Sequence, residues 1–272
     1  MDMVGLHFET SKVGASPAKR KLVYSTLEQA LKRHGISITY YAMWALEGKR
    51  GQYKKYGNHW HQKRLAKGFD DIDGLGFCAN PLGSNAPAYD WTAKADFSWT
   101  VTTNVTLLIP KENCDFNGPE YHETIEALSN LEPWDYGWAL IGDRNKGVAP
   151  YTSGDWSDGC LSKQDNDRLD LWYASSYPEP EKRLTHLRDI FHHNFVTNRH
   201  LDFPVFGGTL ATFIQNDKNS TLTPISDTLS LWAVNRTYLK KIRNKLQPSG
   251  LLISRPSTGS TSLFRRVLNN LS

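Results

Sequence analysis

Ser157-Asp158-Gly159-Cys160 is the motif in this 272-residue sequence that comes nearest to covalent chemistry. A cysteine thiolate can attack a carbonyl carbon, but it needs a nearby base, such as a histidine, to take the thiol proton. No histidine lies between His122 and Cys160, and the charged residues around Cys160 are mainly acidic. Negative neighbours disfavour the thiolate and raise the thiol pKa. We therefore expect that Cys160 is not a nucleophile.

These four residues resemble the Ser-x-Gly-Cys signature of L,D-transpeptidases, whose cysteine is the nucleophile. That family carries a His-Gly pair a short distance upstream of the cysteine, and this sequence does not. A cysteine-dependent enzyme that uses Cys160 is therefore the least favoured interpretation, behind the two binding functions considered below. We expect that the protein is not an enzyme.

Two histidine pairs, His59-x-His61 and His192-His193, could supply metal ligands. No cysteine or carboxylate cluster completes either pair at the spacing of a metal site. The sequence also lacks the glycine-rich loops that bind nucleotide phosphates and dinucleotides. We expect no metal and no cofactor.

Charge is distributed unevenly around a formal net charge of +4. Residues 1–111 hold 15 Lys/Arg against 9 Asp/Glu, and residues 171–272 hold 13 against 6. The central acidic segment, residues 112–170, holds 4 against 13. An uneven charge distribution indicates what charge a binding partner carries and can steer the association of the two molecules. It predicts that the central acidic segment faces a protein partner with a basic surface.

An aromatic stretch, Glu132 to Trp138, lies within the central acidic segment. Trp138 shares a strand face with Tyr136 and Leu140, which predicts a core position. Trp134 follows Pro133 in a turn, which predicts an exposed ring that contacts a partner. With the acidic residues of the loop-like sequence nearby, the candidate partner-binding residues are Trp134, Asp135, Asp143, Asp155, Trp156, Asp158, Asp165 and Asp167.

The expected elements alternate irregularly between strands and helices, which favours an α+β fold with a mixed, mainly antiparallel sheet and packed amphipathic helices. We expect a single domain over residues 1–272, with a sub-boundary near 172–180, a polar lead-in at 11–21 and a short tail at 256–272. Ser25 is expected to begin a helix that ends at Gly35, and Pro119 another. Apolar spacing predicts one long strand, or two strands joined by a bulge, over Phe97–Ile109. It also predicts a helix over 184–195 and a strand over Thr209–Ile214.

The order of features from Phe97 to Trp138 resembles that of immunity proteins of bacterial polymorphic toxin and type VI secretion systems. A strand ends in Leu107-Leu108-Ile109-Pro110, an acidic helix follows, and a Trp-Asp turn leads into the next strand. The order of features is similar to that of the immunity protein 52 family, whose partners are nuclease toxins. That family's amino-terminal Tyr-Trp-Gly-Pro-Arg-type segment is absent here, where the corresponding piece reads Tyr40-Tyr41-Ala42-Met43-Trp44. The resemblance implies a protein that binds and neutralises a cognate toxin.

Nucleic acid is the other expected class of partner, because the two basic arms could bind phosphates. Lys49–Lys67 mixes basic and aromatic residues, a composition found in nucleic-acid-binding proteins and also in solvated helices. A phage or mobile-element accessory protein is therefore the alternative to an immunity protein. The sequence starts without a basic and apolar signal region and lacks a long apolar run, so we expect a cytoplasmic protein with no membrane partner.

Overall fold

The computed structural model describes residues 1–12, 16–45, 53–80, 91–99, 102–153, 161–176 and 179–253. The chain forms two compact units: Met1–Trp134 with Ile141–Arg144, and Asp135–Leu140 with Asn145–Ser272. The predicted sub-boundary near residues 172–180 falls inside the second unit. The assignment of one folding domain stays a prediction.

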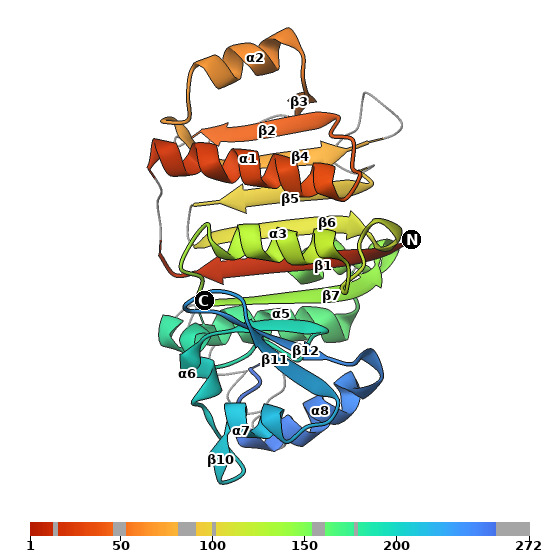
Figure 1. Ribbon diagram of the computed structural model, residues 1–272, viewed down its shortest axis with the longest axis vertical. Helices are drawn as coiled ribbons and strands as arrows, with labels where there is room; N and C mark the ends of the chain where they lie inside the picture. The colour runs from red at the N-terminus through yellow and green to blue at the C-terminus, as the bar shows by residue number, and fades with distance from the viewer. Residues whose placement is uncertain are drawn as a thin grey trace. The chain divides into compact units, whose positions relative to one another are not determined.

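The first unit is built on an antiparallel sheet with strand order β1-β6-β5-β4-β2-β3. Its strands are β1 Asp2–Thr10, β2 Tyr40–Ala45, β3 Lys54–Lys55, β4 Ile72–Ala79, β5 Ala93–Ser98 and β6 Thr103–Pro110. Its helices are α1 Pro17–Arg33, α2 His59–Ala66, the short 3-10 helix η1 Lys111–Asn113 and α3 Pro119–Ser129. In Figure 1, α1 and α3 lie across one face of this sheet and α2 lies beyond its β2–β3 edge.

Alternation along the strands decides which side chains reach the core of the first unit. Val4, Leu6 and Phe8 of β1 share one face and are buried. Leu27 of α1 and Leu128 of α3 are also fully buried. The core of the first unit therefore lies between its sheet and the α1–α3 layer.

The second unit contains an antiparallel sheet with strand order β11-β12-β8-β7 and a separate β9–β10 hairpin. Its strands are β7 Tyr136–Asp143, which ends in the first unit, β8 His193–Val196, β9 Pro204–Val205, β10 Gly208–Thr209, β11 Ser220–Pro224 and β12 Ser230–Val234. Its helices are η2 Arg144–Lys146, which begins in the first unit, α4 Val148–Ser153, α5 Lys163–Ser176, η3 Pro180–Leu184, α6 Asn198–Leu201, α7 Leu210–Gln215, η4 Arg236–Tyr238, α8 Leu239–Leu246 and η5 Gln247–Ser249. The predicted α+β class with a mainly antiparallel sheet is thus confirmed.

Four element predictions differ from the structure in whole or in part. Helix α1 begins at Pro17, inside the expected polar lead-in, because Ser16 Oγ accepts a hydrogen bond from Lys19 N at 3.3 Å and caps the helix there. The stretch Phe97–Ile109 is divided between two strands, as one of the two alternatives had it, but β5 and β6 pair antiparallel with each other. Residues 184–195 form no long helix and end in β8, and Thr209 caps helix α7 rather than starting a strand.

Within the part of the chain that the structure describes, no helix is both long enough and apolar enough to cross a lipid bilayer.

Candidate functional site

Trp134, the central residue of the predicted contact site, is buried in the first unit. Only 2% of the residue is exposed, and its ring lies 5.7 Å from Phe8 and 6.0 Å from Phe97, measured between ring centroids. The indole Nε1 donates a hydrogen bond to Leu128 O at 2.7 Å. The expectation that this ring is exposed was wrong, because the turn after α3 folds the indole back under the helix it follows.

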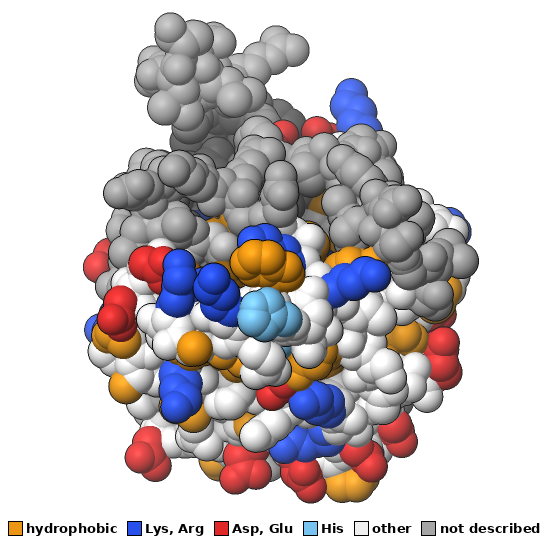
Figure 2. Space-filling model, turned by 90° about the horizontal axis from the view of Figure 1, so that it is seen from above, with side chains coloured by type: hydrophobic (Ala, Val, Ile, Leu, Met, Phe, Trp, Pro, Cys, Tyr) orange, Lys and Arg blue, Asp and Glu red, His pale blue; other side chains and the backbone are white. Residues whose placement is uncertain are grey.

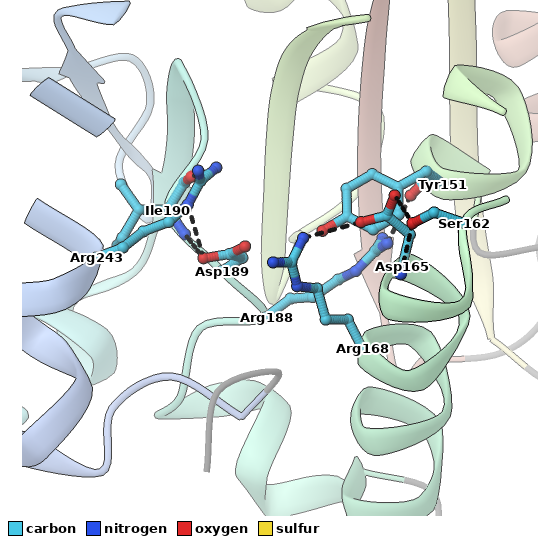
Figure 3. A network of polar contacts seen from close by, with 8 residues as sticks. All are labelled: Tyr151, Ser162, Asp165, Arg168, Arg188, Asp189, Ile190 and Arg243. Atoms are coloured by element: carbon cyan, nitrogen blue, oxygen red, sulfur yellow. Dashed lines mark hydrogen bonds and ion pairs between the residues drawn. The ribbon is translucent and has the colours of Figure 1, made fainter. Parts of the chain in front are cut away.

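Trp138 is a core residue of the second unit, as predicted, with 1% of the residue exposed. Its ring packs on Phe191, and the Arg188 guanidinium lies 4.9 Å from the Trp138 ring centroid. Arg188 also lies 4.4 Å from the Tyr151 ring and donates from Nη2 to Tyr151 O at 2.6 Å. Figure 3 shows this arginine directed toward Tyr151. A buried cation held by aromatic faces thus links α4 to β7.

The neighbouring Asp189 is fully buried and forms an ion pair with Arg243, which is also drawn in Figure 3. Its Oδ1 accepts from Arg243 Nε at 3.0 Å and from Ile190 N at 2.8 Å. Arg243 Nη2 donates to Ile190 O at 2.6 Å, so the guanidinium bridges a side chain and the main chain. This pair ties α8 to the segment before β8.

The described acidic residues of the central acidic segment are divided between the two units. Glu132 is buried and pairs with Lys19 at 2.6 Å, and Glu123 of α3 pairs with Arg33 at 2.9 Å, all in the first unit. Asp143 also belongs to the first unit, where it lies 3.7 Å from the amino terminus. Asp135 is half-buried at the start of β7 in the second unit. Three of the 13 acidic residues counted along the segment therefore have a cationic partner within the first unit.

Helix α5 carries the remaining described carboxylates of the predicted site. Asp165 and Asp167 lie on this helix and not in a loop, as the sequence had suggested. Asp165 accepts a hydrogen bond from Ser162 Oγ at 2.7 Å and pairs with Arg168 at 2.8 Å. It therefore stabilises the first turn of the helix. Asp167 is exposed. Asp165 thus has a local structural role, whereas Asp167 projects into solvent.

Asp170 stands one helical turn after Asp167 and was missed by the sequence reasoning. Burial raises the pKa of the Asp170 carboxyl, and the negative charge of Asp167 raises that pKa further. Like charges three residues apart on a helix repel each other. The spacing of Asp167 and Asp170 was the signal that could have revealed this pair. We call Asp167 and Asp170 the α5 acidic pair; a cation placed beside it would relieve the repulsion.

Asp155, Trp156, Asp158 and Cys160 lie outside the described residues. The other two cysteines, Cys78 and Cys114, are buried, and burial raises the pKa of each thiol to about 12. Neither is a thiolate near neutral pH, so neither is prepared for nucleophilic attack.

The two histidine pairs do not present paired metal ligands. His61 is buried while His59 is exposed, and His192 is half-buried with a pKa lowered to about 4 by burial and by Arg236 and Arg243. Among the described residues, no group of three or more His, Cys, Asp or Glu side chains is arranged to hold a metal ion.

A polar cluster lies on the face of the first unit's sheet opposite to α1 and α3. His7 Nδ1 and Thr106 Oγ1 are 2.8 Å apart across β1 and β6, and His7 Nε2 lies 3.7 Å from Glu9 Oε2. A hydroxyl, an imidazole and a carboxylate in this order could pass a proton. The His7 and Glu9 side chains are only 2% and 5% exposed, so this cluster joins two strands and does not reach a substrate from solvent.

No protein-family model matches the chain, and no curated protein matches its sequence. A solved structure of the Pseudomonas aeruginosa T6SS protein PA0821 does match it, with a TM-score of 0.53 and 11% sequence identity. The match covers 93% of this chain and 73% of the Pseudomonas chain. The two proteins share a fold. At this identity the likeness extends to the fold alone, and membership of the immunity protein 52 family stays a prediction.

Proposed function

We propose that this chain is an immunity protein of a type VI secretion system that binds and neutralises a cognate toxin, such as a nuclease, in the cytoplasm. It does so by direct protein–protein contact and without catalysis of its own. The partner is a protein toxin with a basic surface. The α5 acidic pair and Asp135 supply negative charge that attracts this partner.

The observation that carries this proposal is the fold shared with a protein described as belonging to a type VI secretion system, along 93% of the chain. The resemblance of Phe97–Trp138 to immunity proteins points to the same system. Fold alone does not determine function. The sharper support comes from α5, where two carboxylates on one helix face repel each other and would be stabilised by a basic partner.

Complex formation with the protein encoded by the neighbouring open reading frame tests the proposal. Asp167→Lys combined with Asp170→Lys is expected to lower the association rate about tenfold at low ionic strength, because rim charges act mainly on association. The difference should shrink as salt is added, since exposed charges are screened. Stopped-flow or surface plasmon resonance measurements over a range of salt concentrations check this.

The matched control is Asp202→Lys with Asp227→Lys, which changes two exposed acids of the second unit that lie off α5. This variant has the same net charge and should associate much faster than the α5 variant. Equal association rates for the two variants would show that α5 is not part of the contact surface, but they would not contradict toxin binding. Absence of a complex with the unmodified chain would contradict the proposed function itself.

Cys160→Ala is expected to bind the toxin and protect cells as well as the unmodified chain does. The reason is that Cys160 stands in acidic sequence without an upstream histidine. Growth of toxin-expressing cells and the dissociation constant of the complex are the two readouts. Loss of protection with retained binding would show that the cysteine performs chemistry.

A further inference from the structure

Helix α2 presents the most exposed tryptophan of the described residues. Trp60 is 62% exposed, with the His59 ring at 5.7 Å and Lys63 Nζ 5.4 Å from its ring centroid. Lys67, one turn further on, and Lys54 and Lys55 of β3 are exposed as well. We call these residues the Trp60 face: Lys54, Lys55, His59, Trp60, Lys63 and Lys67. Figure 2 looks onto this end of the unit and shows Lys and Arg side chains around an exposed hydrophobic group, with a histidine beside it.

The fold fixes the outward direction of Trp60 through the next residue. His61 is buried, and its Nδ1 accepts from Gly57 N at 3.0 Å while its Nε2 lies 2.8 Å from Tyr24 Oη. The Tyr41 ring packs on it at 4.2 Å. Since His61 is anchored to α1 and β2, its neighbour Trp60 is held on the solvent side of α2. The large apolar ring therefore contributes little to the core and remains open to a ligand.

The charge around Trp60 has one sign over a long stretch of chain. Residues 48–69 contain seven Lys/Arg and no Asp or Glu. Arg64 is bound to Asp71 and to Gly68 O, whereas Lys54, Lys55, Lys63 and Lys67 extend into solvent. Lysine ammonium groups act as mobile point charges that contact phosphates without fixed geometry.

We infer that the Trp60 face binds single-stranded nucleic acid. An unpaired base stacks on the indole, and the four lysines follow the phosphate backbone on either side. A base can stack on an exposed aromatic ring only if it is not already stacked between its neighbours in a duplex. This requirement favours a single strand over a duplex. The run of cations without an intervening carboxylate favours a regularly charged polyanion over a protein with mixed surface charges. This inference does not depend on the proposed toxin binding.

Binding of fluorescein-labelled dT20 to the full-length chain, followed by fluorescence anisotropy at 50 mM salt, tests the inference. Trp60→Ala should weaken binding about tenfold, which corresponds to the stacking of one base. Lys54→Glu with Lys55→Glu should weaken binding and flatten its salt dependence, because each lost phosphate contact reduces the slope by about 0.7. Trp60→Phe should recover part of the affinity.

Lys240→Glu with Lys241→Glu on α8 is the matched control, since both lysines are exposed and belong to the second unit. It should leave dT20 binding nearly unchanged. The inference is overturned if dT20 does not bind, if Trp60→Ala binds as tightly as the unmodified chain, or if the control loses as much affinity as Lys54→Glu with Lys55→Glu. Polyglutamate that competes as well as unlabelled dT20 would overturn it in favour of an acidic protein partner.

Discussion

Replacing Trp134 by alanine is expected to lower the free energy of unfolding by about 3–5 kcal/mol, the range seen when a buried tryptophan is truncated. The substitution removes an indole that contacts Phe8 and Phe97, together with the hydrogen bond that its Nε1 donates to Leu128 O at 2.7 Å. Urea unfolding followed by circular dichroism measures the loss. Trp134→Phe keeps part of the ring contact and should lose less stability than Trp134→Ala.

Trp60→Ala is the matched control for Trp134→Ala, because it truncates the same side chain at a position that is 62% exposed. An exposed substitution usually changes stability by no more than about 0.5 kcal/mol. If Trp134→Ala unfolds at the same urea concentration as the unmodified chain, Trp134 is not buried as described. It would then again be a candidate residue for binding a partner.

Arg243→Ala is expected to cost about 3–5 kcal/mol, because it leaves the carboxylate of Asp189 buried without its guanidinium. Asp189 is fully buried, and Arg243 also donates to Ile190 O, so one substitution removes both contacts that tie α8 to this segment. Thermal unfolding and a double-mutant cycle with Asp189→Asn measure the coupling between the two side chains.

Arg199→Ala supplies the comparison for Arg243→Ala, since Arg199 lies 3.9 Å from Glu181 with both side chains largely exposed. An exposed pair of this kind contributes between zero and about 1 kcal/mol. Similar losses for Arg199→Ala and Arg243→Ala would mean that the Asp189 pair is solvated in solution.

Local signals predicted part of the fold well. Pro119 begins α3, the run from Tyr136 is a strand, and Gly35 and Gly250 stand just past helices in the left-handed conformation that glycine adopts readily. These features depend on a few neighbouring residues. Ser25 failed as a helix start because Ser16 and Pro17 supply an equally good start eight residues earlier.

Predictions that required knowledge of tertiary contacts were less successful. Leu187, Phe191 and Phe195 have helical spacing, yet Arg188 and Asp189 between them are buried, and the chain runs irregularly into β8. Arg188 is held by the Trp138 and Tyr151 rings, and Asp189 is ion-paired with Arg243. Trp134 was expected to be exposed because it follows Pro133 beside Asp135. Sequence neighbours could not reveal that Phe8, 126 residues earlier, lies against its ring.

The candidate site was predicted only in outline for a related reason. A charge count along the chain cannot show that Glu132 and Glu123 pair with Lys19 and Arg33 of α1. It also could not show that α5 is a helix on which Asp167 and Asp170 face the same way. The basic stretch around Trp60 was visible in the sequence, but its exposure depends on the burial of His61 against Tyr24 and Tyr41.

Growth protection tests the central claim most directly. Cells that express the protein encoded by the neighbouring open reading frame, with and without this chain, are compared over several generations. Direct neutralisation predicts that the toxin alone stops growth, that co-expression of this chain restores it, and that both proteins elute as one complex. Growth arrest that persists despite stable expression of this chain would contradict its assignment as an immunity protein.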